Sequence, residues 1–109
     1  MSVVIRTDSP PLRQDESGAL RVGQSRVLLE LVIEDFQDGA TPEAIVQQYA
    51  TLTLYDVYAV IAYYLHHRQE VDAYLAEREV LSQQVRQRIE AAQGDLGEIR
   101  RRILARGQA

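Results

Sequence analysis

The chain of 109 residues contains no cysteine and no lysine. The first absence excludes disulfides and thiolate metal sites. The second makes arginine the source of all 12 basic charges, which reflects either genome composition or a preference for planar, bidentate donors. No apolar run approaches the roughly 20 residues that a membrane span needs. The amino terminus also lacks the charged-then-apolar pattern of a secretory signal, so we expect a cytoplasmic protein without membrane contact.

Signatures of catalysis are missing too. The sequence has no recognisable Ser-His-Asp set, no glycine-rich phosphate loop and no His-Glu-x-x-His motif. His66 and His67 are adjacent, so on a helix they point in different directions, and no third metal ligand lies near them in the sequence. We therefore predict that the protein is not an enzyme and takes no cofactor, metal or small-molecule substrate.

Charge is distributed unevenly along the chain. Residues 1–67 carry a net charge of −5, whereas residues 68–109 carry +1, with four arginines against one acid from Glu98 onward. Affinity for DNA comes from neutralised phosphates and released counterions, so the acidic part is a poor phosphate binder. The composition, 46 % hydrophobic and 26 % charged, is typical of one compact domain with an extension.

Residues 1–26 predict an amino-terminal β-arm. Residues 3–6 and 11–13 read as short extended segments around two prolines, which disfavour helix. A turn at Ser17-Gly18 then leads to a strand-like segment at 19–22. Strands this short cannot bury themselves alone, so they need the helical body or the same strands of a second copy.

Residues 27–67 predict a body of three helices with a helix-turn-helix layout. Apolar residues recur at helical spacing over 27–36, and Gly39 is a natural stop. Thr41 is a natural N-cap for a helix through Gln48, with proline at its first position. Thr53 and Asp56 form a capping box for a further helix over 54–66. The first helix is predicted to turn Leu28, Leu29, Val32, Ile33 and Phe36 inward.

The helix predicted at 54–66 is apolar nearly all round, which is typical of a helix buried on more than one side. One side faces the body, and the other needs a second surface, because so large an exposed patch marks an interaction site. Either a second copy covers it, making the protein a homodimer, or the chain's own long helix folds back over it. The inward face is Val57, Val60, Ile61, Tyr64 and Leu65; the dimer interface is predicted at Tyr55, Tyr58, Ala62 and Tyr63.

Residues 68–109 predict a long helix followed by a short one. The first runs from Arg68 to Gln93 with a narrow apolar stripe, typical of a helix laid along a partner. Gly94 is predicted to stop it, and Asp95 with Glu98 would cap a last helix from residue 96 to about residue 105.

The segment from residue 22 to residue 65 resembles the domain-of-unknown-function 433 family over roughly residues 12–75. That family shows a Gly-x-Thr/Ser-Arg-Ile/Val segment, a Gly-x-Ser/Thr-x-Glu-x-Ile turn-helix and a Leu-Thr-x-x-x-Val-x-Ala helix. One departure is Ala50, where the family usually has proline. The matching residues are Gly23, Ser25, Arg26 and Val27, then Gly39, Thr41, Glu43 and Ile45, then Leu52, Thr53, Val57 and Ala59.

The resemblance implies a mostly α fold, with a homeodomain-like three-helix body, a short amino-terminal β-arm and a long carboxy-terminal helical extension. It also implies the antitoxin of a type II toxin–antitoxin pair, similar to VapB proteins, whose partners are PIN-type ribonucleases. Arginines at the tip would then reach the acidic nuclease site through bidentate bonds. The predicted partner-binding residues are Ile99, Arg100, Arg101, Ile103 and Leu104. The alternatives for the tip are a solvated amphipathic helix and a homodimeric helix pair.

Operator DNA is a further possible partner, because dimeric antitoxins repress their own operon. A paired β-arm would then bring Arg13, Arg21 and Arg26 to phosphates, unless Arg26 pairs with Glu30 one helical turn away. Two functional alternatives to the antitoxin therefore stay open. One is a DNA-binding transcriptional regulator of the helix-turn-helix type, and the other is a homodimeric interaction protein without a nuclease partner.

Overall fold

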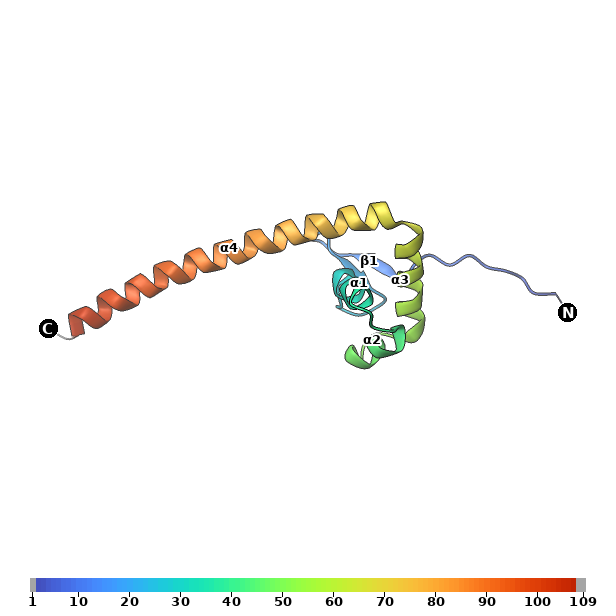
Figure 1. The fold of residues 1–109 in the computed structure, drawn as a ribbon, viewed down its shortest axis with the longest axis horizontal. Helices are drawn as coiled ribbons and strands as arrows, with labels where there is room; N and C mark the ends of the chain where they lie inside the picture. Colours follow the sequence, from blue (N-terminus) through green and yellow to red (C-terminus); the bar gives the residue numbers. More distant parts are fainter. Residues whose placement is uncertain (1, 108–109) are drawn as a thin grey trace. The chain divides into compact units, whose positions relative to one another are not determined.

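The structure of the chain, a computed structural model, describes residues 2–107, with the side chains of 94–99 and 105–107 outside that description. It is mostly helical, with a two-stranded sheet and four helices in the described part (Figure 1). The chain divides into two compact units, Met1–Ala73 and Tyr74–Ala109. No helix of the described residues is long and apolar enough to cross a membrane.

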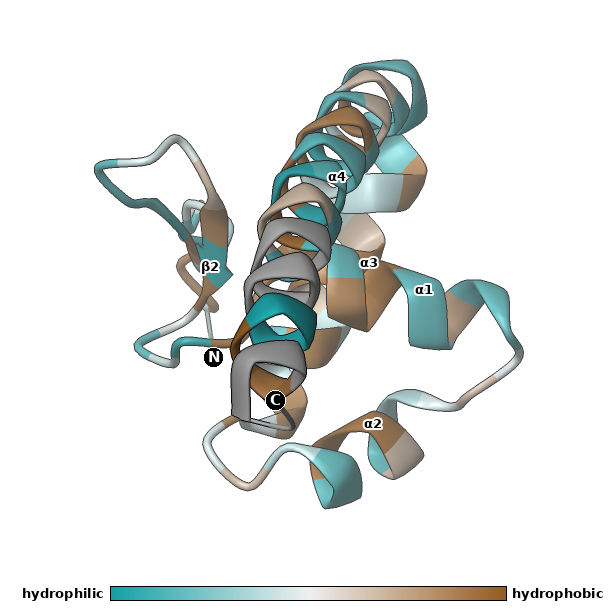
Figure 2. Cartoon of the chain, turned by 90° about the vertical axis from the view of Figure 1, so that its left-hand side faces the viewer, coloured by the Kyte–Doolittle hydropathy of each residue, from teal (hydrophilic) through white to brown (hydrophobic). Residues whose placement is uncertain are grey.

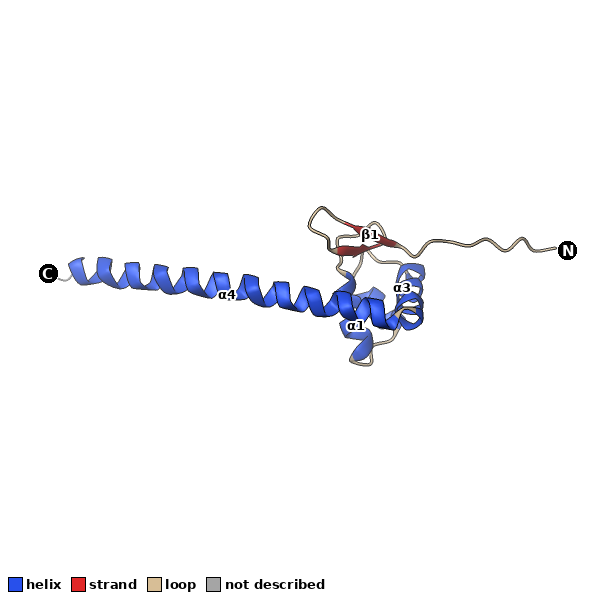
Figure 3. Cartoon of the chain, turned by 90° about the horizontal axis from the view of Figure 1, so that it is seen from above, coloured by secondary structure: helices blue, strands red, loops and turns tan. Residues whose placement is uncertain are grey.

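The β-arm is a hairpin of β1 (Leu12–Gln14) and β2 (Leu20–Val22), paired antiparallel with Arg13 opposite Arg21. Its loop is closed by the Asp15 carboxylate, which accepts hydrogen bonds from the backbone of Ser17 and Ala19 at 2.9 and 3.0 Å. Figure 3 shows the two strands together, beside the helices of the same unit. The extended segment predicted at residues 3–6 forms no strand and is exposed.

The first helix, α1 (Leu29–Gln37), begins two residues later than the periodicity predicted. Leu28 is not helical, because it forms an isolated β-bridge with Arg21 and has an extended backbone. The prediction that Leu28 belongs to the helical stripe was therefore wrong. The rest of the stripe is correct in part, since Leu29, Val32 and Ile33 are buried whereas Phe36 is half-buried.

The next two helices begin where local chemistry predicted. In α2 (Pro42–Gln48), the Thr41 hydroxyl accepts from Ala44 N at 3.2 Å. In α3 (Leu54–His66), the capping box is complete: Asp56 Oδ2 accepts from Thr53 N at 3.2 Å, and Thr53 Oγ1 from Asp56 N at 3.1 Å. In the turn between them, Leu52 N donates a hydrogen bond to Tyr49 O at 3.0 Å. The turn thus closes with Ala50 at the position where the family usually has proline.

The core of the Met1–Ala73 unit lies where α1, α2, α3 and β2 meet. Each element contributes fully buried aliphatic side chains, which is what drives these short elements together. Tyr64 of α3 is buried as well, and its hydroxyl accepts from Gln37 Nε2 at 3.1 Å. The buried apolar residues are Ala19, Val22, Leu29, Val32, Ile33, Ile45, Leu52, Val57, Val60, Ile61, Tyr64 and Val71.

The last helix, α4, runs unbroken from Arg68 to Gly107 over 40 residues. The predicted stop at Gly94 and the separate helix from residue 96 to residue 105 were therefore wrong. A glycine in a helix interior costs about 1 kcal/mol, and Gly97 adds a second such cost. The alanines, glutamine, leucine and glutamate of this stretch favour helix, and the helix continues through both glycines. No helix starts near residue 95, and the side chains of Asp95 and Glu98, which were predicted to cap such a start, lie outside the described residues.

Candidate functional site

Helix α3 carries an exposed apolar face. Tyr55 is 58 % exposed, Tyr58 51 % and Leu65 52 %, and Leu54 and Ala62 are exposed with them. Positions 55, 58, 62 and 65 follow each other at spacings of three and four, so they form one stripe along the helix. Figure 2 shows α3 largely in the brown and pale colours of hydrophobic and intermediate residues. We call Leu54, Tyr55, Tyr58, Ala62 and Leu65 the α3 face.

One sequence assignment on α3 needs correction. Leu65 was predicted to point inward, but it lies on the α3 face. Tyr63, predicted at the dimer interface, is half-buried and stacks on His67, with ring centroids 4.3 Å apart and planes at 22°. The spacing 55-58-62-65 in the sequence could have identified the correct stripe. Of the four predicted interface residues, Tyr55, Tyr58 and Ala62 therefore share the exposed face.

A carboxylate lies at the edge of this face. The hydroxyl of Tyr58 donates a hydrogen bond to Glu43 Oε1 of α2, and both residues are exposed. This bond lowers the pKa of Glu43 and raises the pKa of Tyr58. A second acid, Asp56, lies in the first turn of α3. Negative charge beside a helix opposes the approach of phosphates.

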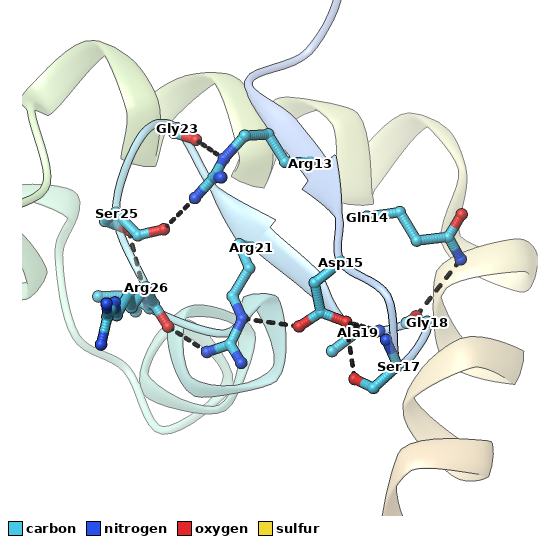
Figure 4. A network of polar contacts seen from close by, with 11 residues as sticks. Arg13, Gln14, Asp15, Ser17, Gly18, Ala19, Arg21, Gly23, Ser25 and Arg26 are labelled. Atoms are coloured by element: carbon cyan, nitrogen blue, oxygen red, sulfur yellow. Dashed lines mark hydrogen bonds and ion pairs between the residues drawn. The ribbon is translucent and has the colours of Figure 1, made fainter.

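The β-arm arginines hold the arm together (Figure 4). Arg13 donates from Nε to Gly23 O at 2.8 Å and from a terminal nitrogen to Ser25 O at 2.6 Å. Arg21 donates to Asp15 Oδ2 at 3.1 Å and to the carbonyl of Arg26. The guanidinium groups of Arg13 and Arg21 thus bind the arm's own backbone and carboxylate. Sequence reasoning missed this role because it depends on partners that the hairpin brings close.

Asp15 is the acid around which this network is built. Hydrogen bonds from the Ser17 side chain, the Ala19 backbone and the Arg21 guanidinium lower the pKa of Asp15 to about 2, although desolvation acts in the opposite direction. At neutral pH its charge is therefore fixed, and with Arg21 it forms an ion pair that is only partly exposed.

Two residues of the first family motif, Gly23 and Ser25, shape the local backbone. Gly23 has a φ of +58°, where L side chains are strained, and an added Cβ would stand 2.8 Å from Asp56 Oδ2. Ser25 is buried, and its hydroxyl donates to Val22 O at 2.6 Å and accepts from Val27 N at 3.1 Å. Arg26 has an exposed side chain. Of the three β-arm arginines, Arg26 is thus the one whose guanidinium is not held in the hairpin network of Figure 4.

An open, shallow pocket of about 500 Å³ lies between the β-arm and the start of α3. Its lining includes Arg13 and Asp56, whose charged groups are already engaged with backbone groups at 2.6–2.8 Å and 3.2 Å respectively. The other lining residues are Pro10, Pro11, Leu12, Gly23, Gln24, Thr51 and Thr53. The pocket therefore presents prolines, threonines and backbone, with no pair of free acid and base groups.

The two histidines lie where α3 meets α4. Their rings are in edge contact at 4.8 Å, and His67 Nδ1 is 3.2 Å from Tyr63 O. Among the residues that the structure describes, no three histidine, aspartate or glutamate side chains gather in a way that could hold a metal ion. His67 thus terminates α3, where its backbone N–H bonds to Tyr63 O and Tyr64 O.

The tip of α4 presents charged and apolar side chains together. Arg100 and Arg101 are exposed, Ile103 is 63 % exposed and Leu104 is 65 % exposed. On a helix, Arg100 shares a face with Ile103 and Leu104, because they are three and four residues apart. The side chain of Ile99, the fifth predicted contact residue, lies outside the described residues.

The sequence comparisons agree with the resemblance seen in the motifs. Residues 16–64 match the family described as Protein of unknown function (DUF433). No curated protein and no solved structure matches the chain. The matched segment extends from the hairpin loop to near the end of α3, and it contains Gly23, Thr41 and Thr53, which shape the turns described above. Over residues 16–64, the chain is therefore similar to the DUF433 family.

Proposed function

We propose that the protein is a cytoplasmic, non-catalytic antitoxin of a type II toxin–antitoxin pair, which binds and neutralises a PIN-type ribonuclease through the end of α4. The observation that carries the proposal is the exposed tip, where Ile103 and Leu104 stand beside Arg100 and Arg101. Helices that bind partners use large aliphatic side chains of this kind as anchors.

The tip has the chemistry that an acidic nuclease site would require. PIN-type nucleases hold metal ions with clustered carboxylates, and guanidinium groups bind carboxylates through paired, charge-assisted hydrogen bonds. The last part of the chain is also its most basic part, with four arginines against one acid from Glu98 onward. We infer that one or two arginines reach the acidic site while the aliphatic residues anchor the helix nearby.

The body would serve association. We infer a homeodomain-like arrangement of α1, α2 and α3, with the α3 face turned to a second copy of the chain. Tyrosine suits such a contact, because its ring is buried while its hydroxyl keeps a partner, as Tyr58 does with Glu43. The acids at this face favour this interpretation over the DNA-binding regulator.

Co-expression with the neighbouring toxin tests the antitoxin role. A chain ending at Gln93 lacks the tip, and we expect it to lose neutralisation. Arg101→Glu should weaken neutralisation at least tenfold, whereas the matched control Arg86→Glu, also on an exposed position of α4, should not. Undiminished protection by the truncated chain would contradict the role of the tip.

Association through the α3 face has a separate test. A chain ending at Leu75 keeps the whole Met1–Ala73 unit, and its mass in solution should be that of a dimer. Tyr55→Glu with Ala62→Glu should make it monomeric, whereas Gln47→Glu, on the exposed side of α2, should not. A monomeric chain ending at Leu75 would exclude this interface. Binding of upstream DNA at stated salt concentration would favour the regulator.

A further inference from the structure

The Tyr74–Ala109 unit consists of one helix, the larger part of α4, and it carries an uncovered apolar stripe. Leu81 is 47 % exposed, Val85 53 % and Ile89 52 %. These values are those of side chains on a helix that no other element of the same unit covers. A helix without packing partners gains little stability from its sequence alone, so the stripe calls for a partner.

The spacing of this stripe is that of a two-stranded coiled coil. Val85, Ile89 and Ala92 follow at intervals of four and three, and the sequence continues the same intervals through Leu96, Ile99 and Ile103. This is a heptad repeat, with Ile89, Leu96 and Ile103 at one core position and Val85, Ala92 and Ile99 at the other. The residues between them are mostly Arg, Glu and Gln, so the apolar seam is narrow.

We propose that a second copy of this chain covers the seam, with the two α4 helices side by side and antiparallel. The charges favour this direction. Residues 74–80 carry a net charge of −1, from Glu77 and Glu79 against Arg78, whereas residues 100–106 carry four arginines and no acid. A parallel pair would bring the two arginine clusters together, and like charges in contact are destabilising.

One register satisfies both the seam and the charges. With Ile89 opposite Ala92 of the second copy, Glu79 comes opposite Arg102 of the second copy and two residues, about 3 Å along the axis, from its Arg100. By symmetry this attractive contact occurs twice. The same register lays the whole Tyr74–Gly107 segment along itself, so neither end of the helix is left without a partner.

This pairing does not rest on the proposed antitoxin role. Ile103 and Arg100 lie in or beside the seam, whereas Arg101 and Leu104 fall on the outer side of the heptad. The paired helices would thus leave Arg101 and Leu104 accessible to a third protein, whereas Ile103 and Arg100 would contact a nuclease only after the two helices separate. Failure of nuclease neutralisation and failure of helix pairing would be separate results, because the tests below use the full chain without a nuclease.

Label distances test the direction of pairing. The chain has no cysteine, so Ser82→Cys provides a single site for a nitroxide label on an exposed seam position. In the proposed register, Ser82 lies opposite Ile99 of the second copy, so two labels are separated along the axis by about 17 residues, or about 25 Å. A parallel pair would hold them about 10 Å apart. The antiparallel proposal is overturned by the short distance.

Solution mass tests the seam itself. The test uses a full chain that already carries Tyr55→Glu and Ala62→Glu, so that the α3 face cannot hold a dimer. In this chain, Val85→Glu with Ile89→Glu places two charges in the seam, and we expect the mass by analytical ultracentrifugation to fall by half at micromolar concentration. The matched control, Gln84→Glu with Gln87→Glu, adds the same charge to the outer side of the same turns and should keep the original mass. Circular dichroism verifies that the body stays folded in both. A monomeric chain with only the α3-face changes, or an unchanged mass in the seam variant, overturns the proposal.

Discussion

The hydroxyl of Tyr64 donates a hydrogen bond to Asp72 Oδ1 at 2.9 Å, across the bend where α3 ends and α4 begins. The same hydroxyl accepts from Gln37 Nε2 at 3.1 Å, and the guanidinium of Arg68 lies 5.6 Å from the centre of the Tyr64 ring. One buried side chain thus joins the end of α1, the end of α3 and the first turn of α4. This contact fixes the start of the long helix on the body.

Removing this hydroxyl should destabilise the body while leaving its packing intact. Tyr64→Phe keeps the ring and removes two hydrogen bonds, each worth about 1 kcal/mol net. We expect the free energy of unfolding to fall by about 1–2 kcal/mol in urea titrations. Tyr55→Phe, which changes a tyrosine that is 58 % exposed, is the control and should have no measurable effect. Equal stability of the two variants would contradict the role given to Tyr64.

The helix starts of the body were predictable because their causes are local. Thr41 with proline after it, and Thr53 with Asp56 three residues on, satisfy the first backbone N–H groups from within a few residues. The start of α1 was not predictable in this way. Leu28 is kept extended by a bridge to Arg21, which lies on a strand seven residues earlier. Periodicity alone cannot reveal such a pairing.

The candidate site was predictable in outline only. The apolar character of α3 predicted an exposed surface with Tyr55, Tyr58 and Ala62 on it, but the sequence did not reveal that Leu65 points outward and Tyr63 stacks on His67. The direction of Tyr63 depends on His67, which lies at the end of α3. Likewise, the bonds of Arg13 to residues 23 and 25 exist only once the hairpin has formed.

Gly23 should tolerate no side chain. Its φ is +58°, and an added Cβ would stand 2.8 Å from Asp56 Oδ2, the atom that caps α3. Gly23→Ala should therefore cost about 1–2 kcal/mol of backbone strain and a further share of a cap worth about 1 kcal/mol. Gly18→Ala is the matched control, since Gly18 has a φ of +87° with nothing within 4 Å of the added Cβ. Thermal unfolding should rank Gly23→Ala clearly below Gly18→Ala, and the reverse order would contradict the close approach of Asp56.

The hairpin should weaken in acid because of Asp15. Its pKa in the folded chain is about 2, below the ordinary value of 3.8, mainly through the Ser17 hydroxyl and then through Ala19 and Arg21. A carboxylate with a depressed pKa stabilises the fold above its unfolded pKa, and this contribution disappears as pH falls from about 4 toward 2.

The variant Asp15→Asn separates charge from shape. It keeps one side-chain oxygen as an acceptor but cannot bear a negative charge. We expect the unmodified chain to be more stable than Asp15→Asn at pH 6, with the difference shrinking as the pH approaches 2. Unfolding curves at several pH values measure this difference. A difference that is constant over the whole range would mean that the Asp15 charge contributes nothing.

The variant Gly94→Ala should raise helicity if α4 is continuous and lower it if a helix ends at Gly94. In a continuous helix, Gly94→Ala replaces the costly residue and should raise helicity and stability by up to about 1 kcal/mol. If the helix ended there, glycine would be the favoured terminal residue, and alanine would destabilise the end. Helical content from circular dichroism, compared with the exposed control Ala92→Gly, decides the matter. A loss of helix in Gly94→Ala would restore the break.

Replacing Arg13 should lower the stability of the fold, whereas replacing Arg26 should leave it nearly unchanged. Arg13→Gln removes a guanidinium that holds the carbonyls of Gly23 and Ser25, so we expect a loss of about 1–3 kcal/mol in the free energy of unfolding. Arg26→Gln changes an exposed side chain and should leave stability within about 0.5 kcal/mol. If the β-arm does contact operator DNA, Arg26→Gln would weaken binding and flatten its salt dependence, because a phosphate contact is lost. Gel shifts at two salt concentrations, run beside urea titrations of both variants, separate the two roles. Equal destabilisation by both replacements would show that Arg26 is also part of the arm's internal support.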